Sequence, residues 1–217
     1  MIVIGAKGFA KEILEVLVSK KYGYNEKNLF FFDNVNKLQS KKIFDKYLVL
    51  SSYKDLENPL SKTDNYFCFG IGNPKHRKLL GEEFVSRGWS LQTIISQTSS
   101  IGRFNTTIGE GTTIIGNAQI TNSVTIGKGC LIYMNTSIAH DVSVGEFVEL
   151  SPGVILTGNC TIGDFTSLGA GTIVLPKIKI GRNCIIGSGT VVTKDIPDNS
   201  MVVGVPGKVI KTLPYFE

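Results

Sequence analysis

The feature that most constrains this chain is an apolar residue at every sixth position of its C-terminal half. From Ile108 to Val192, every sixth residue is Ile, Leu or Val without exception. From Ile114 onward, the residue two positions before each of these is Thr, Ala, Val, Cys or Ile. Neither an α-helix nor a flat strand has this period. A fixed short repeat indicates a solenoid, in which each unit buries its apolar side against its neighbours.

A second, longer period groups the hexads into coils. Ile-Gly or Val-Gly recurs at 108, 126, 144, 162 and 180, eighteen residues apart. Three hexads therefore make one coil of a triangular prism with a short strand on each face. The run predicts five coils, a prism about 24 Å long at about 4.8 Å between stacked strands. We expect each of these glycines at a corner, because glycine adopts backbone angles that other residues resist.

The composition changes near residue 97, which predicts two domains, 1–97 and 98–217. Residues 1–97 hold 15 Lys and Arg against 10 Asp and Glu, so the net charge of +5 lies there. An anionic partner should meet this part of the chain. A lysine-rich solvated surface would explain the same imbalance.

No leader, cleavage site or long apolar run is found in the sequence, which predicts a cytoplasmic protein without a membrane or nucleic-acid partner. Three of the four cysteines occupy the small-residue position of the repeat, where a core role explains them, and Cys68 lies in an apolar run. There is no CxxC pair, so the sequence suggests neither a metal site nor a disulfide framework.

The N-terminal domain has the order of elements of a Rossmann-like fold. We expect a strand over 1–4, a glycine turn, a helix over 9–19 and a strand over 29–32 that ends at Asp33-Asn34. A third strand over 66–71 leads into Gly72 and a helix that carries His76 and Arg77. The glycine turns and Asp33 would then meet at the carboxyl ends of parallel strands, where such sheets bind ligands. Alternatively, the glycines serve only tight turns.

Two resemblances make these expectations specific. The repeat resembles that of the hexapeptide-repeat acyltransferases, which implies a left-handed parallel β-helix, although the usual crossover rule would predict a right-handed one. Both halves together resemble the NeuD/PglD-like family of sugar O/N-acyltransferases of bacterial surface-glycan synthesis. The resemblance rests on the opening IGAKGFAKE and the ending GVPGK, and covers nearly the whole chain. It implies acetyl-CoA as co-substrate, a nucleotide-linked amino sugar as acceptor and a homotrimer with active sites between subunits.

His140 is the candidate general base. Acetyl transfer to an amine needs a group that removes a proton and a donor that stabilises the oxyanion, with neither a metal nor a covalent intermediate. His140 stands two residues after a core Ile, where side chains face outward. An ordinary surface histidine would fit the same place. The family's base lies in a matching Ile-x-His-(Asp/Glu) segment, which implies that Asp141 orients the imidazole.

The resemblance also implies contacts to the two substrates. Gly158 lies one coil after His140, where its N–H could reach the acetyl carbonyl or where glycine merely relieves a corner. Contacts to CoA fall on Ala170, Ser188 and Lys208. Contacts to the sugar nucleotide fall on Lys7, Gly8 and Phe9 near the diphosphate, Asp33 and Asn34 near the base, Gly72, and Arg77 as phosphate ligand or helix-surface residue.

Two departures from the family pattern concern the acceptor. Many relatives have Gly-Gly-His where this chain has Lys7-Gly8-Phe9, and Asn where it has Tyr133, which could face the sugar. We therefore expect N-acetylation of a nucleotide-linked 4-amino-4,6-dideoxyhexose, with O-acetylation of sialic acid or a related sugar as the alternative. A non-catalytic sugar-nucleotide-binding scaffold is a third possibility. A zinc enzyme is disfavoured because the prism has one histidine rather than three.

Overall fold

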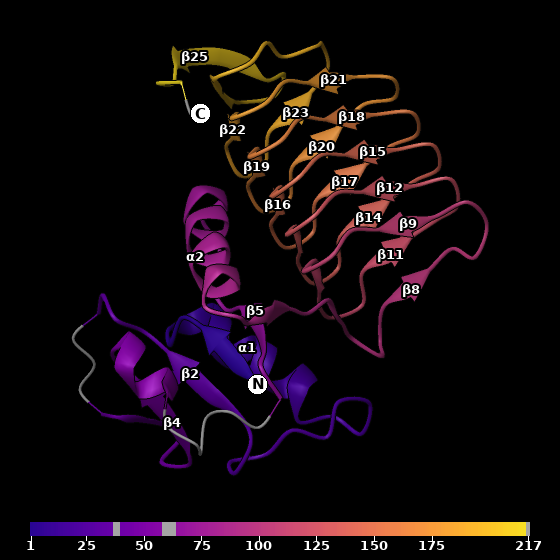
Figure 1. Cartoon of the computed structure of the whole chain (residues 1–217). Coiled ribbons are helices and arrows are strands. Elements are labelled where there is room, and N and C mark those ends of the chain that lie inside the picture. The colour runs from indigo at the N-terminus through magenta and orange to yellow at the C-terminus, as the bar shows by residue number, and fades with distance from the viewer. Residues whose placement is uncertain (37–39, 58–63, 216–217) are drawn as a thin grey trace. The chain divides into compact units, whose positions relative to one another are not determined.

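The computed structural model describes residues 1–36, 40–57 and 64–215 (Figure 1). The chain divides into two compact units. The first comprises Met1–Gly72 and His76–Ile94, and the second comprises Asn73–Lys75 and Ile95–Glu217. The first is an α/β unit and the second is a solenoid.

The α/β unit is built on a six-stranded sheet in the order β3-β4-β2-β1-β5-β6. Its strands are β1 (Ile2–Ile4), β2 (Phe30–Phe32), β3 (Lys42–Ile43), β4 (Tyr47–Leu50), β5 (Tyr66–Phe69) and β6 (Ser90–Leu91). Its helices are α1 (Gly8–Leu17), α2 (Pro74–Ser86) and the 3-10 helix η1 (Tyr53–Glu57). The predicted order of strand, glycine turn, helix, strand, strand and helix is confirmed.

Apolar runs explain why these segments form the centre of the sheet. The residues of β1 and β2 are all buried, as expected for parallel strands covered on both faces. β1 pairs in parallel with β2 on one side and with β5 on the other. Helix α1 buries one stripe of side chains at helical spacing, namely Ala10, Ile13, Leu14 and Leu17.

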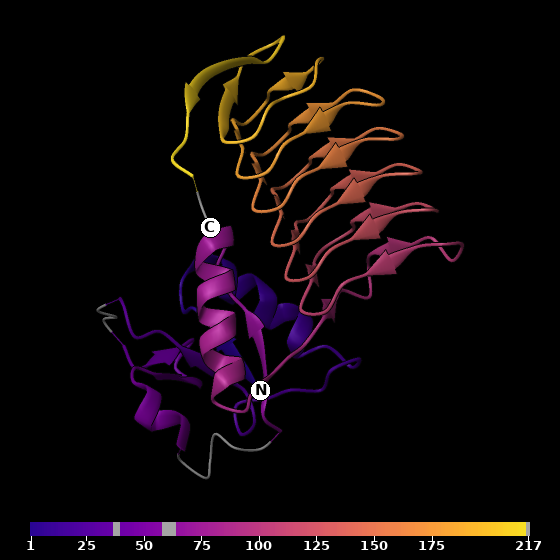
Figure 2. The same cartoon turned by 45° about the horizontal axis from the view of Figure 1, so that its top comes forward.

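The second unit is a left-handed parallel β-helix with three faces, each a stack of short strands (Figures 1 and 2). Face 1 contains β7 (Ile94–Ile95), β10 (Thr113–Ile114), β13 (Leu131–Ile132), β16 (Glu149–Leu150), β19 (Ser167–Leu168), β22 (Ile185–Ile186), β24 (Ser200–Val203) and the antiparallel β25 (Lys208–Thr212). Face 2 contains β8 (Ser100–Ile101), β11 (Gln119–Ile120), β14 (Ser137–Ile138), β17 (Ile155–Leu156), β20 (Ile173–Val174) and β23 (Val191–Val192). Face 3 contains β9 (Thr107–Ile108), β12 (Thr125–Ile126), β15 (Ser143–Val144), β18 (Thr161–Ile162) and β21 (Lys179–Ile180).

The register of the strands confirms the eighteen-residue coil. On face 2, Ile120 pairs with Ile138 and Ile138 with Leu156. Every apolar residue of the hexad run is buried except Ile108, which is partly buried. The predicted five coils fall short, because β7, β8 and β24 continue the stacks beyond the hexad run at both ends.

The small residues at the second core position of the repeat are buried as predicted, with Ile178 partly buried, and most of the polar ones donate hydrogen bonds to corner carbonyls. Thr112 and Thr166 each donate their hydroxyl to a glycine carbonyl fifteen residues further on, Gly127 and Gly181, at 2.8 Å. The Cys130 thiol makes the same contact with Gly145. These small polar side chains are tolerated in the core because they reach a carbonyl of the next coil. Thr190 is the exception, since its buried hydroxyl has no hydrogen-bond partner among the described residues.

The reason expected for the repeated corner glycines is wrong. The residues with left-handed backbone angles recur at every sixth position from Asn105 to Gly189, and the Ile-Gly glycines are not among them. What Gly127 and its equivalents avoid is contact with the next coil. A Cβ on Gly127 would lie 2.6 Å from the Gly145 carbonyl carbon. The coils come so close at this corner that only glycine fits.

Candidate functional site

His140 and Asp141 form a contact pair at the corner between faces 2 and 3. His140 follows β14, and its Nδ1 lies 2.7 Å from Asp141 Oδ2. The two side chains are 63% and 53% exposed, so an approaching substrate can reach both. Asp141 has a φ of 59°, which is the left-handed angle that this corner requires and that Asp adopts more readily than most residues. A carboxylate on Nδ1 leaves Nε2 as the nitrogen that can accept a proton.

Gly158 lies against the His140 ring, as the eighteen-residue spacing predicts. The Asn159 N–H donates to the His140 carbonyl at 3.0 Å, which fixes the two coils to each other. A Cβ on Gly158 would lie 2.6 Å from His140 Cε1 and 2.8 Å from Nε2. Because Gly158 has no side chain, the imidazole can occupy this position, and the space beside Nε2 stays open.

The other residues predicted on the β-helix lie at a different corner. Tyr133, Ala170 and Ser188 are all at the corner between faces 1 and 2, one or two residues after a face 1 strand. Ala170 accepts a hydrogen bond from the Gly189 N–H, and a Cβ on Gly169 would lie 2.6 Å from Ser188 N. Lys208 begins the exposed strand β25. Within one chain, face 2 separates this group from His140.

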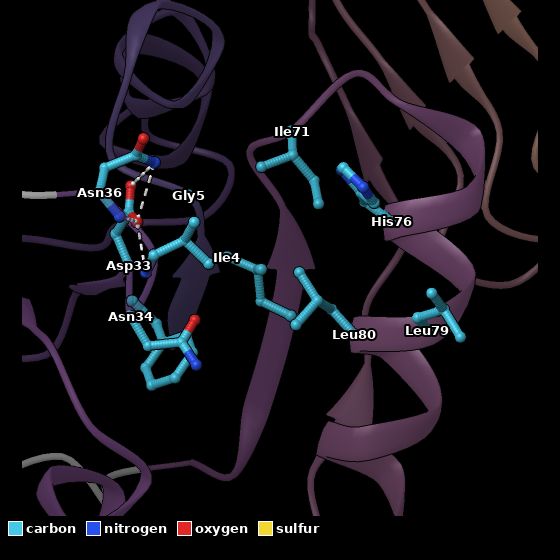
Figure 3. A pocket seen from close by; sticks show the side chains of 11 residues that line it. Ile4, Gly5, Asp33, Asn34, Asn36, Ile71, His76, Leu79 and Leu80 are labelled. Carbon is cyan, nitrogen blue, oxygen red and sulfur yellow. Dashed lines mark hydrogen bonds between the residues drawn. The ribbon is translucent and has the colours of Figure 1, made fainter.

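The α/β unit contains a cavity of about 490 Å³ at the carboxyl ends of its parallel strands (Figure 3). The ends of β1, β2 and β5 form one side, and helix α2 forms the other. The cavity is lined by Ile4, Gly5, Phe32, Asp33, Asn34, Val35, Asn36, Ile71, His76, Leu79 and Leu80. Mostly apolar walls with a few polar groups are typical of a small-molecule site.

Asp33 and Asn34 line this cavity, and Asp33 is held in place by its own loop. Its carboxylate accepts hydrogen bonds from the N–H of Asn36 at 2.9 Å and from the Asn36 amide at 2.9 and 3.0 Å (Figure 3). Asp33 is only 7% exposed. A ligand therefore meets a carboxylate of fixed orientation.

Other residues predicted to contact the nucleotide lie outside the cavity lining. Lys7, Gly8 and Phe9 form the start of α1, with Lys7 as its N-cap. Arg77 is 1% exposed and donates to the Gly72 carbonyl. The predicted place of Arg77 on the helix surface is wrong, because the guanidinium is buried where it supports the loop at Gly72.

His76, to which the sequence assigns no role, lines the cavity from α2 together with Leu79 and Leu80 (Figure 3). These residues have the i, i+3 and i+4 spacing of one helix face. That spacing was visible in the sequence, but nothing in it indicated that the face borders a cavity. Asn36 was missed for a similar reason, because its bond to Asp33 depends on the loop conformation.

The cysteines are unsuited to nucleophilic chemistry. All four are buried, and burial raises the pKa of the Cys68 thiol to about 12. Among the residues that the structure describes, no group of His, Cys, Asp and Glu side chains could hold a metal ion. No helix in the same residues is long and apolar enough to span a bilayer.

Two family models match the chain. Residues 1–84 match the PglD N-terminal domain. Residues 123–158 and 159–194 match the bacterial transferase hexapeptide repeat. A search of curated proteins found no match.

Several solved structures are similar over nearly the whole chain. The acetyltransferase domain of PglB from Neisseria gonorrhoeae FA1090 is 26% identical, with a TM-score of 0.85 over 96% of this chain and 98% of that one. WeeI from Acinetobacter baumannii AYE is 27% identical, with a TM-score of 0.88 over 96% and 98%. A His-to-Asn variant of perosamine N-acetyltransferase from Caulobacter crescentus, in complex with CoA and GDP-perosamine, is 25% identical, with a TM-score of 0.84 over 97% and 96%.

Proposed function

The chain belongs to the NeuD/PglD-like family of sugar O/N-acyltransferases, and from that premise we propose the reaction that it catalyses. It transfers acetyl from acetyl-CoA to the 4-amino group of a nucleotide-linked 4-amino-4,6-dideoxyhexose, for the synthesis of bacterial surface glycans. The observation that carries this proposal is the His140–Asp141 pair, with the Nε2 side of the imidazole beside Gly158.

The reaction is a direct acyl transfer. The acceptor amine attacks the thioester carbonyl carbon while His140 Nε2 takes the amine proton. The tetrahedral oxyanion accepts a hydrogen bond from the Gly158 N–H. The C–S bond then breaks, and the thiolate takes the proton from the imidazolium, which gives the amide and CoA thiol. Asp141 holds the ring in the tautomer that this sequence requires.

The cavity of the α/β unit supports an acceptor that carries a nucleotide. Its apolar walls, including Ile71, Leu79 and Leu80, suit the faces of a planar base, and Asp33 and Asn34 supply hydrogen-bonding groups at its edge. A free sialic acid has no planar base that could occupy such a cavity. Lys7 and Gly8 lie at the start of α1, and the space above Gly8 is open, so that a diphosphate can approach.

The separation of the two corner groups supports a trimer with shared sites. His140 and Gly158 lie on one edge of face 2, and Ala170 and Ser188 lie on the other. A site that uses both groups therefore needs a second copy of the chain. The outward residues of face 2 become apolar toward its C-terminal end, at Ile155, Ile173 and Val191. Packing of three copies along these edges would complete three sites.

The test is thiol release from acetyl-CoA with UDP-, dTDP- and GDP-linked 4-amino-4,6-dideoxy sugars and with free sialic acid. We expect turnover with one nucleotide-linked amino sugar. His140→Ala, with an unchanged circular dichroism spectrum, should lower turnover about a thousandfold. His76→Ala is the control for loss of a histidine elsewhere, and it should change the acceptor KM rather than kcat.

Turnover with sialic acid alone would replace the N-acetylation proposal by O-acetylation. Absence of thiol release with every acceptor would indicate a non-catalytic binding module. Near-normal activity of His140→Ala would overturn the assignment of the base.

A further inference from the structure

One corner of the β-helix departs from the repeat, and it lies on the same edge as His140. Ser100 pairs with Gln119, one residue more than the eighteen that separate Thr107 from its partner Thr125. The extra residue falls in the corner of residues 102–106, between β8 and β9 (Figure 1), which we call the Phe104 loop. The later coils have no such enlargement at this edge.

The Phe104 loop has an ordered backbone. The Phe104 N–H donates to Asn122 Oδ1 at 3.2 Å, and the Phe104 carbonyl accepts from the Ser123 N–H at 2.9 Å. The Thr106 hydroxyl donates to the Thr121 carbonyl at 3.0 Å. These bonds fix the loop to the next coil, yet the Phe104 side chain is 73% exposed. The backbone of the loop is therefore held in place, while its aromatic side chain stays open to contact with a ligand.

The loop is aligned with the candidate base. Phe104, Asn122, His140 and Gly158 occupy the same edge on four successive coils, and the Asp141 N–H donates to the Asn122 carbonyl at 3.4 Å. Two coils, about 9.6 Å at about 4.8 Å per strand, separate Phe104 from His140. In the proposed reaction the thioester contacts the Gly158 N–H, so we place the rest of the acceptor sugar on the opposite, Asn122 side of His140. A hexose that places its amine at His140 extends in this direction.

We propose that Phe104 contacts the acceptor sugar and selects for its 6-deoxy group. This inference rests on the proposed function and deepens it. The ring packs against the apolar face of the sugar and its C6 methyl group, and a 6-hydroxyl at the same place would lose its hydration. Asn122 is a positioning residue, because its side-chain oxygen holds the Phe104 backbone.

The test compares two acceptors that differ only at C6, a nucleotide-linked 4-amino-4,6-dideoxyhexose and its 6-hydroxy counterpart. Wild type should prefer the 6-deoxy acceptor in kcat/KM. Phe104→Ala should reduce this preference about tenfold, as expected for one methyl group in an apolar contact. The KM for acetyl-CoA should not change. Phe104→Leu should retain most of the preference.

Two further variants make the test specific. Asn122→Ala should lower the preference less than Phe104→Ala, and Asn122→Asp should restore it, because a carboxylate oxygen can accept the Phe104 N–H. Phe44→Ala is the matched control, since Phe44 is also exposed but lies at the turn between β3 and β4. It should leave the preference intact.

An unchanged preference in Phe104→Ala would overturn the inference while leaving the proposed function in place. So would a change of molecular mass in light scattering, because Phe104 would then be a subunit contact. Absence of turnover by wild type with either acceptor would overturn the proposed function and the inference together.

Discussion

The two units differ in how position along the chain relates to position in space. In the β-helix, residues eighteen apart are neighbours, so that His140 and Gly158 meet because of their spacing. In the α/β unit, His76 and Arg77 are adjacent in sequence, yet one lines a cavity and the other is buried against the Gly72 carbonyl. A repeat allows a site to be located by counting, whereas a non-repeating sheet requires its tertiary contacts to be known.

The largest expected effect tests the packing of the coils. Gly127→Ala places a Cβ 2.6 Å from the Gly145 backbone, which cannot move without displacing a coil. We expect a loss of about 3 kcal/mol in the free energy of unfolding, measured by urea denaturation. Gly171→Ala is the matched control, because nothing lies within 4 Å of its added Cβ and only its left-handed angle is strained. It should cost about 1 kcal/mol, and equal losses would mean that coil contact is not the constraint.

The next effect tests whether the eighteen-residue spacing also predicts the position of the catalytic site. Gly158→Ala places a methyl group against the His140 ring. Displacement of the base should lower kcat about a hundredfold in the thiol-release assay. The free energy of unfolding should fall far less than in Gly127→Ala, because the exposed imidazole can move away from the added methyl group. Full activity of Gly158→Ala would contradict the proposal that the residue one coil after His140 forms part of the site.

A third variant tests the buried cation of the α/β unit. Arg77→Met leaves the Gly72 carbonyl without its guanidinium donor. We expect a loss of about 2 kcal/mol in the stability of this unit, measured by thermal unfolding. Arg87→Met removes an exposed i,i+4 pair with Glu83 and a cation–π contact with Tyr53, and should cost only about 1 kcal/mol. Similar losses in both would contradict a supporting role for Arg77.

The smallest effect concerns the anchoring of Asp33. Asn36→Ala removes the amide that contacts both Asp33 oxygens. Calorimetry with UDP, dTDP and GDP should show the preferred nucleotide binding several-fold more weakly, a loss of about 1 kcal/mol. Asn25→Ala affects an exposed turn and should leave binding unchanged. Equal affinities for all three nucleotides would indicate that the cavity does not discriminate between bases.

Prediction from the sequence succeeded where apolar residues repeat at a fixed interval. The coil register, the buried small residues and the adjacency of His140 and Gly158 all follow from the hexads. The explanation of the corner glycines was wrong because glycine can recur for either of two reasons. Its own backbone can need a left-handed angle, or the next coil can lie too close for a side chain. The sequence does not distinguish these two requirements.

The cavity was harder to predict. The strand order placed Asp33 at the correct edge of the sheet, because parallel strands end together. The contributions of His76 and Asn36 depend on how α2 and the loop after β2 pack, and no local pattern records that packing. Arg77 shows the same limit, since a basic residue on a predicted helix is ordinarily exposed.

The left-handed position that recurs at every sixth residue restricts which amino acids a corner can accept without strain. Gly, Asn and Asp adopt this angle most readily, and the chain has Asn at several of these positions and Asp at 141. A single base change in a codon converts Asn into Asp. The carboxylate partner of a base is therefore available at almost any corner of such a coil, and a histidine one position earlier completes the pair. The geometry of the repeat itself thus favours an adjacent histidine and carboxylate at such a corner.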